Sequence, residues 1–382
     1  MRREEFSHVC PGELVAITGG YAFVPNPLPP VLEVDWDLAR DLDRAGRSLA
    51  KLDGQASLVQ NKALIVRPLA TREAIQSARL EGTHTQVAEV LLQESAGPAK
   101  DPTEASNNQE VINYLRASTM GERWLADGRP INSFLLRSLH DVLLRRTRGE
   151  RMSPGSFREK QVLIGTRDDS PETARFVPPP PEHVLPAIEN LVSFMTADTT
   201  YPPLISAGIA HYQFETIHPF EDGNGRLGRL CIPLQLMATD AITYPLIYLS
   251  PFFEERRGEY LRLLKVVSTQ GVWTEWLRFF LRAVYTQAED ARSRVELILE
   301  LHDRYRALAS QQRSKGPLVA VDLVMERPVL TVADVQDRAQ CSYPAAKRAL
   351  ETLTELGIVM LMPPSHPQRW IAQELIDKVY AV

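Results

Sequence analysis

One short stretch of the chain, HPFEDGNGRLGRL, gathers residue types that could together bind a phosphate. Gly223, Asn224 and Gly225 can adopt the left-handed backbone conformations that turn several N–H groups inward and form an anion-binding nest. A helix with apolar residues three and four apart is expected from about Arg226, so the positive end of its dipole would point into the same loop. The stretch therefore predicts a phosphate site at a helix N-terminus.

Two arginines and an aspartate belong to this nest. Arg226 and Arg229 are three residues apart, so both would project from the first turn of the helix and could hold different phosphates of a triphosphate. Asp222 offers a hard oxygen ligand, and Mg²⁺ is commonly held by one or two carboxylates together with substrate phosphates. The pattern therefore predicts a magnesium site at Asp222.

A histidine stands directly before the turn. With Pro219 and the apolar Phe220 to hold it, the imidazole of His218 could accept the proton of a hydroxyl group while that oxygen attacks phosphorus. A glycine-flanked asparagine, taken alone, is most often an ordinary turn. Here a base, a metal ligand, a nest and two arginines converge on one helix N-terminus, and each has a separate role in phosphoryl transfer. The combination favours catalysis over a structural turn.

The loop resembles the Fic motif, HPFx[DE]GNGRxxR, at every defining position. AHYQFETIHPF, which includes the start of the loop, and SPGSFREKQVLIG further upstream are also similar to that family. The resemblance implies a helical core with a β-hairpin flap, and transfer of AMP from ATP to Tyr, Thr or Ser hydroxyls of target proteins. It also implies that His218 is the base, that Asp222 binds magnesium, and that the phosphates are held by Asn224, Gly225, Arg226 and, for the γ-phosphate, Arg229. The flap, at about residues 166–176, would align the target by strand addition.

A second stretch, SARLEGT, places Ser77 and Glu81 four residues apart on one face of a helix predicted over 71–81 and ended by Gly82. A glutamate at a helix end is often simply solvated. The stretch nevertheless resembles the inhibitory motif [ST]xxxE[GN] of many Fic proteins, in which the glutamate pairs with the second arginine of the loop. We therefore expect Glu81 to form an ion pair with Arg229 and to keep the basal rate of AMP transfer low.

Other residues near the loop carry weaker signals. Glu215 is expected to support the loop rather than to react. Tyr248 is a candidate contact for the adenine, although its apolar neighbours are also typical of a core. Cys10, Cys231 and Cys341 lie far apart and lack metal-ligand spacing, so no chemistry is assigned to them. A carboxylate beside phosphate could also position water, so removal of AMP from a modified protein stays open as a reverse activity.

The elements that must position these residues are mainly helices. Helical periodicity appears over 34–52, 71–81, 83–93 and 107–126, and again over 182–196, 204–216, 226–238, 253–268 and 272–285. Residues 151–181 are rich in turn formers and give the only convincing β candidate of the first 300 residues. The predicted fold class is mainly α: a Fic helical bundle with a small β-hairpin flap, followed by a C-terminal winged helix.

The predicted organisation has four parts. Residues 1–100 form an N-terminal region that contains the inhibitory helix, and residues 101–285 form the catalytic core. Residues 286–312 form a charged linker helix that the polar break QQRSKG ends. Residues 313–382 have helix-turn-helix proportions, with Thr331 and Ser342 opening two helices and a two-stranded wing after them.

Charge and hydropathy limit the partners. The formal net charge of the 382 residues is −5, and no run approaches the roughly 18 apolar residues of a membrane span, so we expect a cytoplasmic protein without membrane contact. The winged helix offers Lys347, Arg348 and wing residues that include His366 to DNA, but nearby acids dilute that charge. An ATP-sensing, DNA-binding regulator is therefore the rival hypothesis. A homodimer is compatible with the sequence, because small symmetric oligomers are common.

Overall fold

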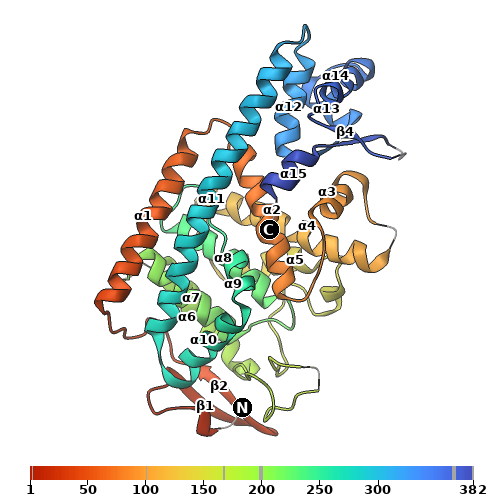
Figure 1. Ribbon diagram of the computed structural model, residues 1–382. Helices are drawn as coiled ribbons and strands as arrows, with labels where there is room; N and C mark the ends of the chain where they lie inside the picture. The colour runs from red at the N-terminus through yellow and green to blue at the C-terminus, as the bar shows by residue number, and fades with distance from the viewer. Residues whose placement is uncertain (2, 100, 167, 198–200, 364–366, 381–382) are drawn as a thin grey trace.

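The computed structural model describes residues 1–382 except 2, 100, 167, 198–200, 364–366 and 381–382 (Figure 1). Its α-helices are α1 (Trp36–Leu58), α2 (Ala63–Leu80), α3 (Val87–Ala96), α4 (Pro102–Ala126), α5 (Ser133–Leu144), α6 (Pro181–Thr196), α7 (Pro203–Ile217), α8 (Asn224–Ala238), α9 (Ser250–Glu255), α10 (Arg257–Gln270), α11 (Trp273–Ser310), α12 (Gly316–Glu326), α13 (Val332–Ala339), α14 (Tyr343–Glu355) and α15 (Gln373–Val379). Two 3₁₀ helices, η1 (Arg3–Glu5) and η2 (Arg148–Arg151), accompany them. The prediction of a mainly helical fold is confirmed.

Helices α7 and α8 form the centre of the bundle. Almost every residue of either helix is buried, including polar ones, as expected of helices that are surrounded on all sides. Helix α7 packs on α6, α8 and α11, while α4 and α5 pack on α8 from another side. The loop that joins α7 to α8 is the predicted phosphate loop, so two deeply buried helices hold it.

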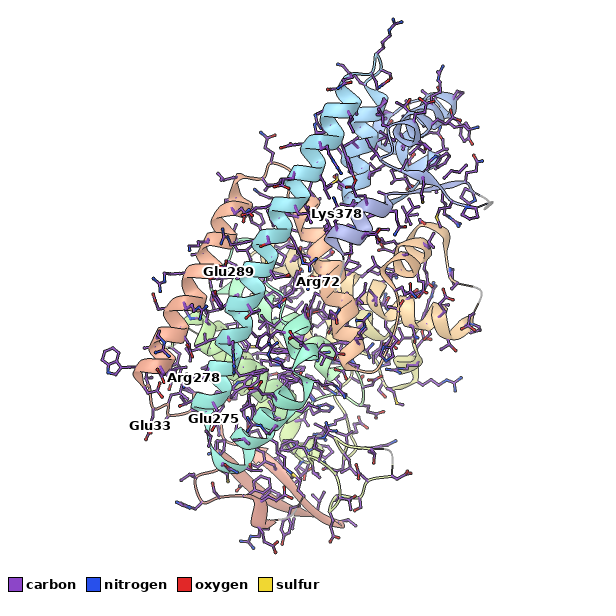
Figure 2. All side chains as sticks on the ribbon, viewed as in Figure 1. Glu33, Arg72, Glu275, Arg278, Glu289 and Lys378 are labelled. Atoms are coloured by element: carbon purple, nitrogen blue, oxygen red, sulfur yellow. The ribbon has the colours of Figure 1, made fainter. Side chains whose placement is uncertain are left out.

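Helix α11 is longer than the sequence suggested. It runs without a break from Trp273 to Ser310, so the helix predicted over 272–285 and the linker helix predicted over 286–312 are one element. No proline or glycine interrupts this stretch, which explains its continuity. Side chains labelled in Figure 2 tie it to α1: Arg278 Nε donates to Asp41 Oδ2 at 3.0 Å, and Ser48 Oγ donates to Glu289 Oε1 at 2.8 Å.

The β structure of the N-terminal part differs from the prediction. Strands β1 (Gly12–Ile17) and β2 (Gly20–Pro25) form an antiparallel hairpin that the sequence reasoning missed. Within the described residues of 151–181, by contrast, strand pairing is confined to Ile164 and Phe176, whose N–H groups donate to each other's carbonyls at 2.9 and 3.1 Å. Local turns take up the residues between them, for instance through the bond from Ser170 N to Thr173 Oγ1, and such bonds compete with a ladder.

The hairpin and the flap segment support each other. Phe23 N donates to the carbonyl of Val177 at 3.0 Å, and the ring of Phe23 packs on Phe6 and Phe176. These residues form a small apolar cluster of their own, separate from the main core. The flap segment is therefore anchored at its base by β2, whose hairpin is labelled in Figure 1.

The C-terminal residues follow the order helix, strand, helix, helix, strand, strand, and end in α15 (Figure 1). Strands β3 (Val329–Thr331), β4 (Met360–Leu361) and β5 (Arg369–Ile371) form an antiparallel sheet in the order β3-β5-β4. The side chain of Thr331 accepts from Asp334 N and caps α13, where a cap was expected. His366 lies outside the described residues. This part packs on α2 and α11.

None of the helices in the described part of the chain has the length and apolar composition that crossing a membrane would require.

Candidate active site

The loop between α7 and α8 has the backbone that the glycines predicted. His218 ends α7 in a left-handed conformation, with φ 48° and ψ 63°, and Gly223 is left-handed with φ 79° directly before α8. The side chain of Asn224 closes the loop, because its Oδ1 accepts from Phe220 N at 2.9 Å and its Nδ2 donates to Phe220 O at 2.8 Å. Asn224 therefore acts on the loop through its side chain, and only its backbone is left for a phosphate.

His140 on α5 is a support that the sequence reasoning missed. Its ring stacks on Phe220 with centroids 3.7 Å apart. Gly155 N donates to Nδ1 at 2.9 Å, so Nε2 carries the proton and donates to the carbonyl of Asp222 at 2.8 Å. Burial lowers the pKa of His140 to about 4, which keeps the ring neutral and this tautomer in place. The sequence feature that could have identified His140 is a lone histidine on the buried face of an amphipathic helix.

Arg158, inside the stretch SPGSFREK, supports the loop from the other side. Its side chain is buried, and it donates to the carbonyls of His218 at 2.8 Å, Ile217 at 3.3 Å and Pro179 at 2.5 Å. Its own N–H donates to Pro219 O at 3.0 Å. These bonds satisfy carbonyls that the end of α7 leaves without helical partners, and they hold His218 in its left-handed turn.

The imidazole of His218 is suited to accept a proton. Burial, helped by the positive charge of Arg158, lowers the pKa of His218 to about 4. The ring is therefore neutral near pH 7, which is the form that a general base requires.

Two nitrogens of the Arg229 guanidinium are bonded to α2 and its C-terminal cap. Nε donates to Ser77 Oγ at 2.9 Å, and Nη2 donates to Ser77 O at 2.9 Å and to Glu81 Oε1 at 2.8 Å. Burial alone would raise the pKa of Glu81, but the Arg229 guanidinium outweighs it and lowers that pKa. Burial would likewise lower the pKa of Arg229, and Glu81 raises it instead. The pair is thus fully charged at neutral pH.

The carboxylate of Glu81 also lies against the first turn of α8. A Cβ on Gly225 would collide with Glu81 Oε1, so the two groups are in close contact. Helix N-termini favour anions at this position. An anionic group of the protein itself therefore stands at the nest where the sequence predicted a phosphate.

Arg226 is held differently. Its side chain is 1% exposed, and Nη1 lies 3.0 Å from Glu110 Oε2, on α4. Within the described part of the chain, Nε and Nη2 have no hydrogen-bond partner, although Asp222 Oδ1 lies 3.5 Å from Nη2. Buried guanidinium donors without partners are costly, so these two donors are suited to bind an anion. Glu110 was not among the predicted site residues, because nothing in the sequence places α4 beside the loop.

A cavity of about 270 Å³ opens beside these groups. His218, Gly225, Arg229 and Glu81 line it, and the rest of the lining includes Ile164 and Phe176 from the flap and Tyr260, Leu261 and Leu264 from α10. The sequence reasoning missed the wall from α10. Tyr248 is buried in the core and is not among the described residues that line this cavity, so a role in binding adenine stays a prediction.

Glu215 also lines the cavity, from the last turn of α7. Its Oε1 has no hydrogen-bond partner among the described residues. Burial raises the pKa of Glu215 to about 7, although Arg229 opposes the shift. This carboxyl group is therefore close to half protonated at neutral pH, which the sequence could not indicate.

Asp222 is the remaining predicted site residue. Its side chain is 36% exposed, and Oδ1 accepts from Gly223 N at 2.6 Å. No cluster of three or more His, Cys, Asp or Glu side chains suited to a metal occurs among the described residues. A lone exposed carboxylate at a phosphate nest fits Mg²⁺ that takes its other ligands from phosphates and water.

Comparisons with known proteins bear on the whole bundle. Residues 39–123 match the model of the Fic/DOC family N-terminal region, and residues 130–236 match the Fic/DOC family model. The chain is 31% identical over 173 residues to protein adenylyltransferase fic-1 from Caenorhabditis elegans, and 29% identical over 127 residues to protein adenylyltransferase Fic from Drosophila melanogaster. These matches cover 42% and 33% of this chain but only 30% and 23% of those proteins.

Solved structures share the fold. A Fic family protein from Desulfovibrio desulfuricans superposes with a TM-score of 0.57 at 21% identity, covering 90% of this chain and 98% of that one. Fic-1 from C. elegans gives a TM-score of 0.52 at 19% identity, covering 68% and 74%. With both halves of the bundle matched by models of one family, and the loop HPFEDGNGRLGR at its centre, the chain belongs to the Fic/DOC family.

Proposed function

We propose that this protein is a protein adenylyltransferase, which transfers AMP from ATP to the hydroxyl group of a Tyr, Thr or Ser side chain of a target protein, itself included. One observation carries the proposal. His218, with its lowered pKa, lines the same cavity as the N-terminus of α8, and a carboxylate already stands at that nest. The similarity to curated adenylyltransferases supports the same reaction.

In the proposed reaction the acceptor hydroxyl oxygen attacks the α-phosphorus of ATP, and its proton passes to the neutral imidazole of His218. The bond from the α-phosphorus to the oxygen bridging to the β-phosphate breaks, and pyrophosphate leaves. The backbone of Asn224 and Gly225, at the positive end of α8, would receive the charge that develops on the phosphoryl oxygens. Arg226 would donate to a phosphate through Nε and Nη2, which are free of hydrogen-bond partners in the described chain.

Asp222 would hold Mg²⁺ beside the phosphate loop. When bound, the ion would neutralise charge on the phosphates and on the leaving pyrophosphate. The carbonyl of Asp222 is already fixed by His140 Nε2 and its Oδ1 by Gly223 N, so this residue is positioned before ATP binds.

The base of ATP would lie along the wall that α10 provides. Leu261 and Leu264 of α10 and Ile164 and Phe176 of the flap give this cavity an apolar lining, as a nucleobase requires. Tyr260 and Ser268 line the same wall with hydroxyl groups.

Autoinhibition belongs to the proposal. Glu81 and a γ-phosphate would compete for the same guanidinium of Arg229, and Glu81 is covalently tethered to the site. The support is the ion pair at 2.8 Å together with the two further bonds from Arg229 to Ser77. Basal transfer is therefore low until the Glu81 segment moves.

The test compares wild type with Glu81→Gly, using ATP labelled on the α- or γ-phosphate. We expect strong protein labelling of Glu81→Gly from the α-label and none from the γ-label, with loss of labelling in Glu81→Gly/His218→Ala. His84→Gly, which places a glycine at an exposed position three residues away, serves as the matched control. Labelling that survives removal of His218, or that comes from the γ-phosphate, rules out the proposed reaction.

The C-terminal residues 313–382 are proposed to form a winged helix, supported by their order of helices and strands. Lys347 and Arg348 are the two basic residues of this helix that were expected to contact DNA. Lys347 Nζ lies 3.7 Å from Glu351 Oε1 on the same helix, and this negative charge weakens the attraction of Lys347 for a phosphate backbone. The target protein and a second copy of this chain are the partners proposed ahead of DNA. The cytoplasm remains the proposed location.

A further inference from the structure

Glu110 is a buried carboxylate for which the proposed reaction has no direct use. Its side chain is 0% exposed, on the inner face of α4. Taking a carboxylate out of water costs several kcal/mol unless it is paired and hydrogen-bonded. Three partners meet it here, from three different segments of the chain: Arg226, Arg148 and Thr83.

The first partner is the first arginine of the loop. Glu110 Oε2 accepts from Arg226 Nη1 at 3.0 Å, while Nε and Nη2 of that arginine have no hydrogen-bond partner in the described chain. A guanidinium is planar and rigid, so fixing one of its nitrogens sets the direction of the others. Glu110 therefore holds Arg226 in place and leaves two donors for an anion.

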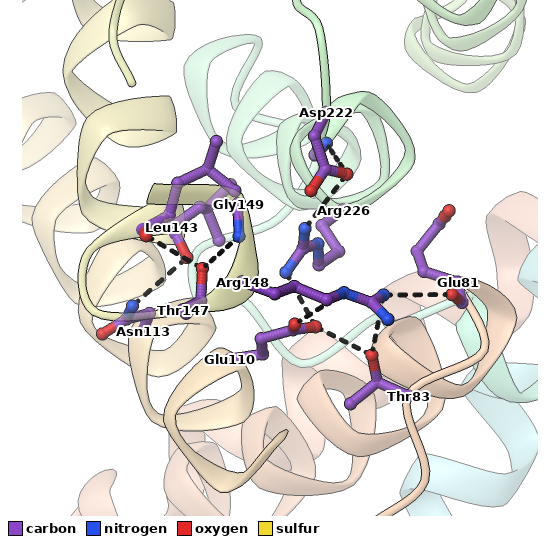
Figure 3. A network of polar contacts seen from close by, with 12 residues as sticks. Glu81, Thr83, Glu110, Asn113, Leu143, Thr147, Arg148, Gly149, Asp222 and Arg226 are labelled. Atoms are coloured by element: carbon purple, nitrogen blue, oxygen red, sulfur yellow. Dashed lines mark hydrogen bonds and ion pairs between the residues drawn. The ribbon is translucent and has the colours of Figure 1, made fainter. Parts of the chain in front are cut away.

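The other two partners lead to the segment that carries Glu81. Thr83 Oγ1 donates to Glu110 Oε2 at 2.9 Å, and Arg148 Nε lies 3.2 Å from Glu110 Oε1. Arg148 Nη2 in turn donates to the carbonyl of Glu81 at 3.3 Å and to Thr83 Oγ1 at 3.1 Å. Figure 3 shows these groups as one continuous network between the loop of Arg226 and the turn after α2.

We propose that Glu110 is a positioning residue with two tasks: it orients Arg226 for a phosphate, and it anchors residues 81–83 so that Glu81 stays on Arg229. The inference rests on the proposed function, because it assigns the guanidinium of Arg226 to a nucleotide phosphate. One carboxylate thereby links both arginines of the loop. Arg226 is bonded to it directly, and Arg229 depends on it through the turn that bears Glu81.

The first task is tested by nucleotide binding without turnover. In the full chain with Glu81→Gly/His218→Ala, we would measure the Kd of ATP with Mg²⁺ by calorimetry, before and after adding Glu110→Gln. We expect the Kd to rise about tenfold or more, since a charge-assisted bond that orients the phosphate donor is weakened. Glu104→Gln, an exposed acid on the same helix, should leave it unchanged. An unchanged or lower Kd in Glu110→Gln overturns the assignment, because removing a negative charge near phosphate would by itself tighten binding.

A readout without nucleotide separates this inference from the proposed function. The Nε–H signal of Arg226 in nuclear magnetic resonance, assigned by its loss in Arg226→Lys, should be that of a rigid group in wild type and mobile in Glu110→Gln. A rigid signal in both proteins overturns the positioning role, whatever the enzyme does. Absence of ATP binding in the parent variant, together with loss of rigidity in Glu110→Gln, contradicts the proposed function but leaves Glu110 as the support of Arg226.

The second task is tested on the wild-type background, where Glu81 is present. Thr83→Val removes the hydroxyl that joins the turn to Glu110 and keeps the shape of the side chain. We expect basal labelling from α-labelled ATP to rise severalfold, while Thr83→Ser stays at the wild-type level. Equal labelling in both variants overturns the anchoring role. If Glu110→Gln does not fold, as judged by thermal unfolding, Glu110→Asp keeps the charge, withdraws it by one methylene and serves for the same two measurements.

Discussion

Glu81 Oε1 lies 2.8 Å from Arg229 Nη2, and the two residues come from segments 148 positions apart in the chain. The carboxylate reaches the guanidinium from the C-terminal cap of α2, where the helix dipole disfavours a negative charge. Arg229 and the N-terminus of α8 offset that cost. The glutamate is therefore held by the same positive groups that we propose for the phosphates of ATP.

Ser77 should share the restraint with Glu81. Ser77→Ala removes the acceptor of Arg229 Nε but leaves the Ser77 carbonyl and Glu81 in place. We expect the labelling of protein by α-labelled ATP to rise about two- to tenfold, as the net contribution of one hydrogen bond is roughly 0.5 to 1.5 kcal/mol. The increase should be smaller than that of Glu81→Gly. An increase equal to that of Glu81→Gly would mean that the serine, not the ion pair, sets basal activity.

The pH dependence of transfer should follow His218. Its pKa is lowered to about 4, so the neutral, basic form predominates above that value. For Glu81→Gly, kcat/KM should be level from pH 8 to about 5 and fall below about pH 4. The fall should follow the protonation of a single group, the His218 imidazole, which can then no longer accept a proton. Glu81 raises this pKa, so its removal should move the acidic limb lower, not higher. An acidic limb near 6.5, the ordinary value, would contradict a buried base.

Folding has to be followed in the same experiment. Burial lowers the pKa values of His140 and His211 as well, to about 4 and about 3. Below about pH 6.5 these histidines are protonated in the unfolded chain but stay neutral in the folded protein. The free energy of unfolding therefore falls as the pH falls. Circular dichroism at each pH therefore separates loss of the base from loss of the fold.

Glu215 should make the protein less stable as the pH rises. Its pKa is raised from 4.5 to about 7, so the folded state holds a proton that the unfolded state has released between those values. Stability attributable to this group is full below pH 4.5 and is lost as the pH rises through about 7. Glu215→Gln should therefore increase the free energy of unfolding by about 1 to 3 kcal/mol at pH 8, with little change at pH 4.5. The comparison is made by thermal or urea unfolding at both pH values.

The opposite result for Glu215→Gln would be equally informative. Destabilisation of the variant at pH 8 would mean that the ionised carboxylate is favoured in the fold, through Arg229. The contribution of Glu81 does not confuse the result, because its lowered pKa confines its titration to pH values below 4.5.

His140 should matter through the loop that it supports. His140→Phe keeps the stacking on Phe220 but removes the partners of Gly155 N and of the Asp222 carbonyl. We expect a loss of about 1 to 3 kcal/mol in the free energy of unfolding, because two buried polar groups lose their bonds. In the Glu81→Gly background kcat should drop about tenfold or more as Asp222 shifts. His84→Phe, at an exposed position, is the control. Unchanged kcat would assign His140 to stability alone.

Much of the site could be predicted from the sequence because its central part is contiguous. His218, Asp222, Gly223, Arg226 and Arg229 lie within one turn and the start of one helix, so local backbone preferences already place them together. The glycine in a left-handed conformation and the helix N-terminus follow from residue types alone. The helical class of the fold followed equally from periodicity.

Elements with weak local signals were misjudged. The β1–β2 hairpin was not predicted, because its strands lie beside a proline-rich stretch. The hairpin packs on the flap segment through Phe23. The flap itself pairs through Ile164 and Phe176, since turn-forming side chains satisfy the backbone between them. For α11, the change from an apolar to a charged surface suggested a boundary that the unbroken backbone does not have.

The sequence by itself determined the conformation of the loop and the helical bundle, and it supplied the chemistry that we propose for the loop, because these depend on residues that are neighbours in the chain. Only the tertiary structure decided which distant side chains complete the site: Glu110 beside Arg226, His140 and Arg158 around the loop, and α10 along the cavity. Each of them acts by burial and by bonds across the bundle. Such contacts depend on how helices pack, and no pattern within a single helix records its neighbours.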